Sequence, residues 1–283
     1  MASDTLPPDA FAFSASSCSF LRPYLRNKSS NPQRPFLTLA YASSLDSAIS
    51  LTPGIHTYLS SPQSEAMTHY LRSQHDAVVV GAGTAIADDP GLNSRVRGMG
   101  GYGGAGLEGQ PRPVVLDPKG RWEWDSNARV LRMVRERKGR GPLIFWGEWG
   151  EGGDWRSKEK QRRDEERERL LKNHGGKIIR LPLVDGKMRW VDILDHLKAE
   201  GIKSVMVEGG GTVINSLLAA EHAHLINSLI VTIAPTLLGQ GGVVVCPKRR
   251  TDDQGNPIPV TRLRDAKWQP MGEDVVLCGK LGE

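Results

Sequence analysis

The chain has 283 residues, 39% of them hydrophobic and 24% charged, with a formal net charge of +5 at neutral pH. This composition is that of an ordinary globular protein, and the three cysteines do not form a disulfide framework. No apolar run reaches the roughly eighteen residues of a membrane-spanning helix, so no membrane partner is expected. The three cysteines are far apart and odd in number, which indicates a reducing, cytoplasmic compartment.

Residues 1–34 are expected to form an N-terminal arm, followed by a single domain at 35–283. The first residues carry acids and prolines instead of the basic segment of a secretory signal. Residues 14–30 are rich in serine, contain three basic residues and lack acids. A transit peptide therefore stays an alternative to a short ordered or fraying arm.

The chain then alternates predicted strands and helices. Residues 35–42 are β-prone, and a polar turn follows at 43–47. Ser61 and Pro62 have the residue types of a helix cap and a first helical position, and the helix that they begin leads to a buried strand at 76–81. Further strands are predicted at 113–117, 143–146, 203–207 and 229–234, and further helices at 191–199 and 212–221. This order predicts an α/β fold with a central sheet flanked by helices.

Two segments are predicted to be surface insertions. Residues 96–110 contain seven glycines and are expected to form a flexible loop. Residues 147–175 begin with a glycine-rich break and continue with charges of both signs, which predicts a solvated helix without an apolar stripe.

A glycine turn lies between the predicted strand at 203–207 and the helix after it. Glu208 precedes Gly209, Gly210 and Gly211, and Thr212 and Val213 follow. Glycines let backbone amides approach a ligand closely, and the start of a helix favours a phosphate. The turn has neither the GxGxxG spacing nor a GK[ST] sequence, so a purely structural turn is the alternative. Glu208 at the strand end favours a position in a cleft.

A second polar segment follows the predicted strand at 76–81. Thr84 and Asp88 are four residues apart, so on one helical turn they would face the same ligand. Asp88, Asp89 and Pro90 would equally end a helix. Arg72 and Arg95 flank this segment and offer guanidinium groups suited to phosphate, although each alone is also an ordinary surface arginine.

The sequence contains no pattern typical of a metal site, a serine hydrolase or a nucleic-acid-binding surface. The histidines form no HExxH motif and the cysteines form no pair, so no metal site is expected. No GxSxG elbow of a serine hydrolase is present. Basic residues are interleaved with acids and form no aromatic-rich stripe, so no nucleic-acid partner is expected.

Five segments occur in the order found in the pyrimidine reductases of riboflavin biosynthesis: TLAYASSLDSAISL, YLRSQHDAVVVGAGTAIADDPGLNSR, PRPVVLD, VMVEGGGTVINSLL and LIVTIAPTLLGQGG. The chain resembles the stand-alone fungal and archaeal type over about residues 35–242, and it is similar to the reductase domain of the bifunctional bacterial deaminase-reductase. TAxxDDPxLxxR together with VEGGG is the most specific part of this resemblance. A deaminase-type HxE and PCxxC pattern is absent from the sequence.

The resemblance implies a dihydrofolate-reductase-like fold with a mixed sheet, a homodimer, and NADPH as cofactor. The residues implied to bind the cofactor are Thr84, Asp88, Gly209, Gly210, Gly211, Thr212 and Val213. Those implied to bind a phosphorylated pyrimidine are Arg72, Leu92, Arg95 and Glu208. Tyr58 and His56 stand where the bacterial domains carry a tryptophan and a serine, and Ser47 replaces a glycine after Asp46, so these positions depart from the pattern.

The implied reaction reduces 2,5-diamino-6-ribosylamino-4(3H)-pyrimidinone 5′-phosphate to the ribitylamino compound. Glu208 is expected to accept hydrogen bonds from the substrate, and Asp46 is the candidate proton donor, with water as the alternative. Lys203, Arg112 and Arg121 are candidate partners for the 2′-phosphate of NADPH. Competing hypotheses are a reductase that acts on the deaminated pyrimidine or a pterin, and a non-catalytic nucleotide-binding module.

Overall fold

The fold is seen in a computed structural model, which describes residues 6–27, 33–148, 158–249, 251–258 and 262–281. Residues 1–5 and 28–32 of the predicted arm and residues 149–157 of the second predicted insertion lie outside the described residues.

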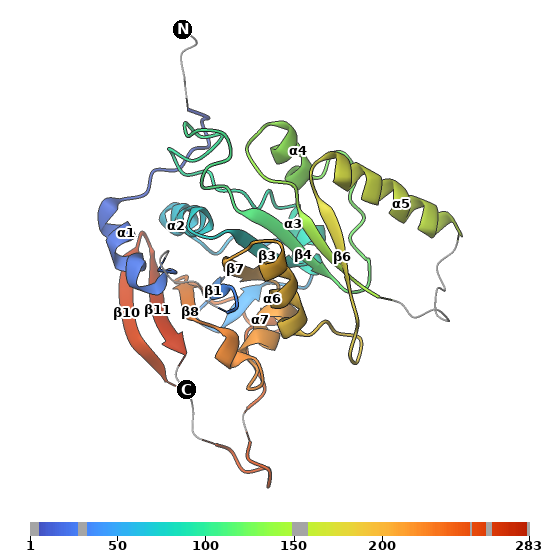
Figure 1. The fold of residues 1–283 in the computed structure, drawn as a ribbon. Coiled ribbons are helices and arrows are strands. Elements are labelled where there is room, and N and C mark those ends of the chain that lie inside the picture. Colours follow the sequence, from blue (N-terminus) through green and yellow to red (C-terminus); the bar gives the residue numbers. More distant parts are fainter. Residues whose placement is uncertain (1–5, 28–32, 149–157, 250, 259–261, 282–283) are drawn as a thin grey trace.

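A nine-stranded sheet forms the centre of the described part of the chain (Figure 1). Its strands are β1 (Phe36–Ser43), β3 (Ala77–Gly81), β4 (Arg112–Asp117), β5 (Leu143–Gly147), β6 (Lys177–Leu181), β7 (Ser204–Gly209), β8 (Ser228–Ile233), β10 (Leu263–Met271) and β11 (Asp274–Leu281). Their order is β10-β11-β8-β1-β7-β3-β4-β5-β6. Strands from β8 to β6 are parallel, whereas β11 is antiparallel to both β8 and β10. A separate ladder joins β2 (Ala48–Ser50) to β9 (Val243–Val244).

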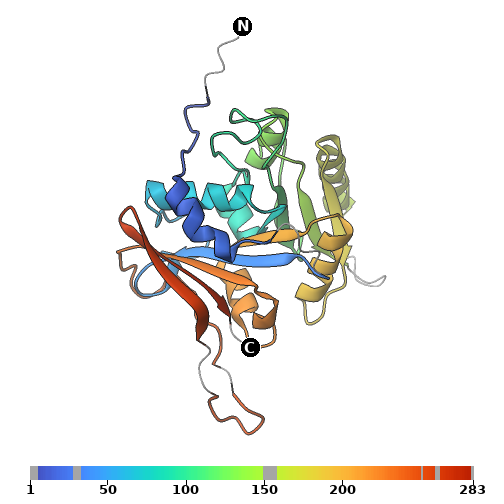
Figure 2. The same ribbon diagram turned by 60° about the vertical axis from the view of Figure 1, so that its left-hand side comes forward.

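Helices cover both faces of the sheet (Figures 1 and 2). They are α1 (Ala15–Leu21), α2 (Pro62–Ser73), α3 (Ala82–Asp88), α4 (Arg129–Arg135), α5 (Lys158–Asn173), α6 (Trp190–Ala199) and α7 (Gly211–Leu218), with short 3₁₀ turns at Arg22–Tyr24 and Ala223–Leu225. Val78 and Val80 of β3 pack with α1 to α5, and Ala77 and Val79 pack with α6 and α7, because successive strand residues point to opposite faces. None of the described helices combines the length and apolar character needed to span a membrane.

The expected α/β fold with a mixed central sheet and flanking helices is confirmed. The helix expected at Ser61 and Pro62 is also confirmed, since the Ser61 side chain accepts the amide of Ser64 and Pro62 is the first helical residue.

The described part of the N-terminal arm belongs to the same core as the sheet. Leu21 and Tyr24 are fully buried, and the Tyr24 hydroxyl donates a 2.5 Å hydrogen bond to the carbonyl of Asp265 in β10. Closer to the N-terminus, Phe11 forms a parallel bridge with Val96. The described part of the arm is therefore ordered by packing against the core.

The two insertions differ from their predicted form. Residues 96–110 fold on themselves through backbone hydrogen bonds, and Tyr102 is only 1% exposed, so this segment packs part of its length into the core. The charged helix α5 forms as expected, but Leu171 in its last turn is fully buried. Leu170, partly buried, packs against the same core, so these two residues hold the helix end although the helix has no apolar stripe.

Candidate functional site

The predicted site residues converge on the carboxyl edge of three neighbouring parallel strands, β1, β7 and β3. Asp46 follows β1, Glu208 is next to the end of β7, and Thr84 follows β3 in α3. Parallel strands end at the same edge of a sheet, and ligands of open α/β sheets bind outside this edge. The fold thus brings together residues that lie more than 150 positions apart in the chain.

Arg72 on α2 and Glu208 on β7 form an ion pair with two hydrogen bonds. Arg72 Nε donates to Oε1 and Nη2 donates to Oε2, both at 2.6 Å, and the two side chains are only 13% and 14% exposed. Burial alone would lower the pKa of Arg72, but the carboxylate of Glu208 outweighs burial and the pKa is raised above its usual value. Arg72 Nη1 also donates to the carbonyl of Asn93 at 3.2 Å. The guanidinium of Arg72 is therefore held charged and in a fixed orientation.

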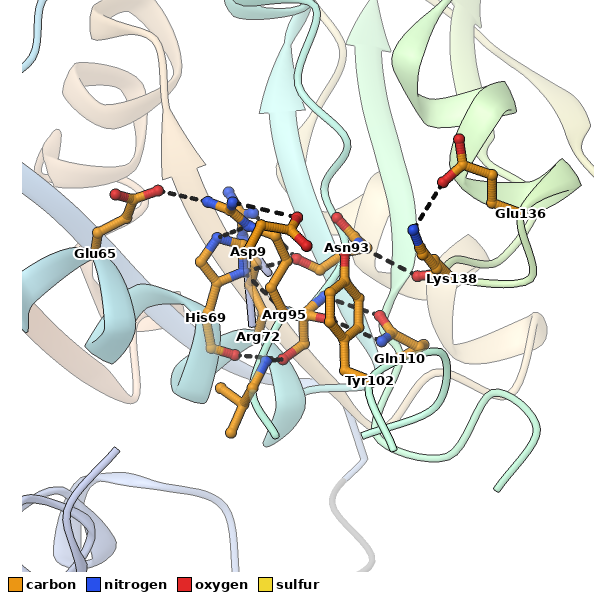
Figure 3. A network of polar contacts seen from close by, with 12 residues as sticks. Asp9, Glu65, His69, Arg72, Asn93, Arg95, Tyr102, Gln110, Glu136 and Lys138 are labelled. Carbon is orange, nitrogen blue, oxygen red and sulfur yellow. Dashed lines mark hydrogen bonds and ion pairs between the residues drawn. The ribbon is translucent and has the colours of Figure 1, made fainter. Parts of the chain in front are cut away.

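Arg95 lies beside Arg72 and has contacts with several other side chains (Figure 3). Its Nε donates to Nε2 of His69 at 3.0 Å and its Nη2 donates to Glu65 at 2.6 Å, while Nη1 lies 3.5 Å from Asp9 Oδ2. The guanidinium also stacks on the ring of Phe11, 4.6 Å from the ring centroid. Arg95 is thus ordered from three sides, and Asp9 and Phe11 of the arm supply one of them.

His69, Asn93, Asp9 and Phe11 were not among the residues predicted from the sequence. His69 lies three residues before Arg72 on one helix, and this i,i+3 spacing places both on the same face. That spacing would have identified His69. Asp9 and Phe11 reach the site from a remote segment, and no local pattern indicates such a contact.

Leu92 differs from the expected form of a substrate-binding residue. It is 1% exposed and has a left-handed backbone with φ of 50°. Its side chain belongs to the core, so any contact with a ligand is restricted to its backbone groups.

The glycine turn after β7 touches the turn after β3. Gly210 has φ of +60°, and a Cβ atom there would lie 3.1 Å from Thr84 Oγ1. A Cβ atom on Gly81 would lie 2.9 Å from a methyl group of Val213. Gly210 itself is the N-cap of α7, whereas Thr212 is exposed and caps nothing in the described structure. The start of α7 therefore presents bare backbone next to the Thr84 hydroxyl, a surface suited to a phosphate.

Asp88 is the last residue of α3, so the reading of this segment as a helix end is confirmed. Its Oδ1 lies 3.0 Å from Nδ1 of His56, and the His56 ring meets Tyr58 edge-on at 4.4 Å between centroids. Tyr58 is 91% exposed. These two residues, which depart from the family pattern, are thus linked to Asp88, and the exposed ring of Tyr58 is available for stacking.

Asp46 holds the turn that follows β8. Its carboxylate accepts the hydroxyl of Ser44 and the amides of Gly239 (2.7 Å) and Leu238 (3.1 Å). These bonds lower the pKa of Asp46 from 3.8 to about 2. A carboxyl group with this pKa carries no proton near neutral pH, so the geometry argues against Asp46 as the proton donor.

Two of the three candidate 2′-phosphate partners lie at the wrong edge of the sheet. Lys203 directly precedes β7 and Arg112 is the first residue of β4, so both are at the amino edge. Each of these strands has six residues and so spans roughly 17–20 Å. Arg121 follows β4 at the carboxyl edge, where its amide donates to Asp117.

Comparison with known proteins gives consistent matches. Residues 35–277 match the model of the RibD C-terminal domain. The chain is 40% identical over 265 residues to the 2,5-diamino-6-ribosylamino-4(3H)-pyrimidinone 5′-phosphate reductase of Debaryomyces hansenii, covering 93% of this chain and 95% of that protein. It is 34% identical over 269 residues to the reductase of the same name from Saccharomyces cerevisiae, again covering 93% and 95%.

Solved structures show the same fold. The riboflavin biosynthesis reductase of Saccharomyces cerevisiae matches with a TM-score of 0.69 and 32% identity, covering 94% of this chain and all of that one. RibD of Acinetobacter baumannii matches with a TM-score of 0.63 and 22% identity, covering 88% of this chain and 59% of that one. The fold implied by the resemblance in sequence is confirmed by these structures.

Proposed function

The chain belongs to the RibD C-terminal domain family, and we propose that it reduces 2,5-diamino-6-ribosylamino-4(3H)-pyrimidinone 5′-phosphate to the ribitylamino compound with NADPH. The observation that carries this proposal is the Arg72–Glu208 pair beside the glycine turn at the carboxyl edge of the sheet. The fungal relatives carry this substrate in their names.

We assign the substrate to the side of the site that holds Arg72, Arg95 and Glu208. A phosphate monoester is dianionic and prefers the planar donors of arginine. Glu208 holds Arg72 in place and offers acceptor oxygens to substrate hydroxyl or amino groups. The deaminated pyrimidine would carry the same phosphate, so it stays the second candidate substrate.

We assign the cofactor to the two touching turns. The residues assigned to it are Thr84, Asp88 and 209–213. At Gly210 the backbone is so close to Thr84 that a side chain there would meet the Thr84 hydroxyl. A bare backbone surface at the start of a helix fits a dinucleotide phosphate. NADPH, when bound, supplies the hydride. The residues of this chain bind and orient both ligands and exclude water between them.

The reaction needs an electrophilic carbon and a proton. Opening of the ribosylamino ring gives an imine, and addition of hydride at C1′ with a proton at nitrogen gives the ribitylamino product. Because Asp46 is ionised, we propose solvent water as the proton source. Glu208 orients the substrate for this step.

We also expect a homodimer in the cytoplasm, as the family resemblance implies. Light scattering of the purified protein tests the oligomeric state, with a mass of about twice 31.0 kDa expected.

The function is tested by following NADPH oxidation with the freshly generated diamino substrate, with NADH in parallel and the product identified by mass. Rapid NADPH consumption and a ribitylamino product are the expected result. Turnover of the deaminated pyrimidine alone would change the substrate assignment. Saturable NADPH binding without turnover of either compound would favour a non-catalytic nucleotide-binding module.

A further inference from the structure

His69 is a buried histidine on α2 that lies beside Arg72 and Arg95, the two candidate phosphate-binding arginines (Figure 3). It is 4% exposed, and its ring stacks on Phe11 at 4.9 Å between centroids. Its Nε2 contacts Arg95 Nε at 3.0 Å, and its Nδ1 lies 3.1 Å from the carbonyl of Asn93. The imidazole thus connects α2, which also carries Arg72, to Asn93 and Arg95.

Arg95 contacts both ring nitrogens of His69. Its Nε donates to Nε2 at 3.0 Å and its backbone amide donates to Nδ1 at 3.1 Å, since guanidinium and backbone N–H groups only donate hydrogen bonds. Nδ1 also lies 3.1 Å from the carbonyl of Asn93. Burial, reinforced by the positive charges of Arg72 and Arg95, lowers the pKa of His69 well below its usual value and keeps the ring neutral.

This arrangement connects His69 to both arginines. Arg95 is bound directly, and Arg72 donates to the same Asn93 carbonyl that Nδ1 of His69 contacts. A neutral acceptor also fixes the direction of a guanidinium without cancelling its charge, as a carboxylate would. The two carboxylates that contact Arg95, Glu65 and Asp9, are 50% and 44% exposed, so water screens them and leaves charge for a ligand.

We propose that His69 is a positioning residue for a phosphate monoester, which it serves by orienting the guanidinium of Arg95 directly and that of Arg72 through the Asn93 carbonyl. This inference rests on the proposed function, because it takes the two arginines as the phosphate-binding groups. His69 itself stays beneath them and does not touch the ligand.

The test compares three variants of the full chain. His69→Leu removes both contacts, His69→Asn retains a polar group only at the position of Nδ1, and His69→Gln places an amide oxygen near the position of Nε2. We expect KM for the phosphorylated substrate to rise about tenfold in the leucine and asparagine variants, and less than threefold in the glutamine variant. The Kd of NADPH should change less than twofold in all three.

His75→Gln is the matched control. His75 is also a buried histidine near the end of α2, but it binds Thr38 Oγ1 at 2.8 Å and the Leu71 carbonyl at 2.7 Å. We expect a lower Tm without a change in KM for this control. If KM follows Tm across all four variants, His69 has only a structural role and the proposal is wrong.

A second measurement keeps the inference separate from the proposed function. Inorganic phosphate that binds the arginines should raise Tm of the wild-type chain by ligand linkage, without any turnover. We expect this shift to be lost in His69→Leu and retained in His69→Gln. If turnover is absent but this pattern is found, the proposed function fails and the role of His69 stands. Absence of a shift in the wild type, or its retention in His69→Leu, would overturn the role of His69.

Discussion

Arg72 and Glu208 face each other through two parallel hydrogen bonds of 2.6 Å, although 136 positions separate them in the chain. The pair fastens α2 to the end of β7, and it also forms one wall of the candidate substrate site. A bidentate arginine–carboxylate pair is strong and strictly oriented. Its loss should therefore affect both stability and activity.

We expect Glu208→Gln to lower the free energy of unfolding by about 3 kcal/mol, because a charged arginine is left without its buried partner. Turnover should fall at least about tenfold, while the Kd of NADPH stays close to the wild-type value. Urea unfolding, steady-state kinetics and a binding titration measure the three effects.

Glu65→Gln is the control for Glu208→Gln. Glu65 also contacts an arginine, Arg95, at 2.6 Å, but its side chain is 50% exposed. We expect a loss below about 1 kcal/mol because solvent screens this pair. Equal losses in the two variants would show that burial of the Arg72–Glu208 pair has no energetic consequence.

The hydrogen bonds of Asp46 are expected to make the thermal stability of the protein depend on pH. Hydrogen bonds from Ser44, Gly239 and Leu238 lower its pKa from 3.8 to about 2. A carboxyl group whose pKa is lowered by folding stabilises the protein above its unfolded pKa, and this stabilisation is lost as the pH falls through the folded pKa. The Tm difference between the wild type and Asp46→Asn should thus be constant above about pH 5 and shrink between about pH 4 and 2.

Asp195→Asn provides the comparison for Asp46, since Asp195 is a surface carboxylate on α6 that is 58% exposed. Its Tm difference from the wild type should be small at every pH. A difference for Asp46→Asn that persists unchanged to about pH 2 would contradict the role of these hydrogen bonds. A fall in kcat of Asp46→Asn near neutral pH would instead restore Asp46 as a candidate proton donor.

Gly210 is expected to tolerate no side chain if the two touching turns bind the cofactor. Gly210→Ala places a Cβ atom 3.1 Å from Thr84 Oγ1 at φ of +60°. We expect a loss of stability of about 1–3 kcal/mol, because φ of 60° with ψ of 146° is a conformation that essentially only glycine adopts, and a rise of about tenfold in the Kd of NADPH. A fluorescence titration with NADPH measures the second effect.

Gly201→Ala separates backbone strain from the effect on the cofactor. Gly201 has φ of +80°, and a Cβ atom there would meet nothing within 4 Å. Its stability should fall by a similar amount, with no change in NADPH affinity. A similar Kd for the two variants would place the cofactor elsewhere.

The central strands could be predicted because their apolar runs are bounded by turn residues. β3 and β7 are buried on both faces and end in glycines, which is typical of parallel strands. The C-terminal hairpin was not predicted, since most residues of β10 are exposed. An edge strand of this kind is held by its backbone ladder to β11, which leaves no periodic apolar pattern.

Local sequence was enough to predict which residues belong to the candidate site. It was not enough to predict which of them contact one another. Glycine turns and nearby arginines indicate a phosphate site from local sequence alone. The pairing of Arg72 with Glu208 depends on the angle at which α2 crosses β7, which only packing determines. For the same reason, the contacts of Asp9 and Phe11 with Arg95 could not be predicted from local sequence.

The contact between Asp9 and Arg95 leads to a final prediction. Asp9 Oδ2 lies 3.5 Å from Nη1 of Arg95, and the Asp9 side chain is 44% exposed. If Arg95 binds the substrate phosphate, the carboxylate of Asp9 competes for the same positive charge. An exposed pair of this kind contributes about 0.2–1 kcal/mol, so Asp9→Asn should lower KM for the phosphorylated substrate by a factor of about 1.4 to 5 at low salt.

The advantage of Asp9→Asn should shrink as salt is raised from about 0.01 M to about 1 M, because the Debye length then falls from about 30 Å to about 3 Å. Asp195→Asn, which removes the same charge far from Arg95, should leave KM unchanged at every salt concentration. Steady-state kinetics of the three chains across this range measure both effects. A higher KM in Asp9→Asn would mean that Asp9 orders Arg95 for the substrate and does not compete with it.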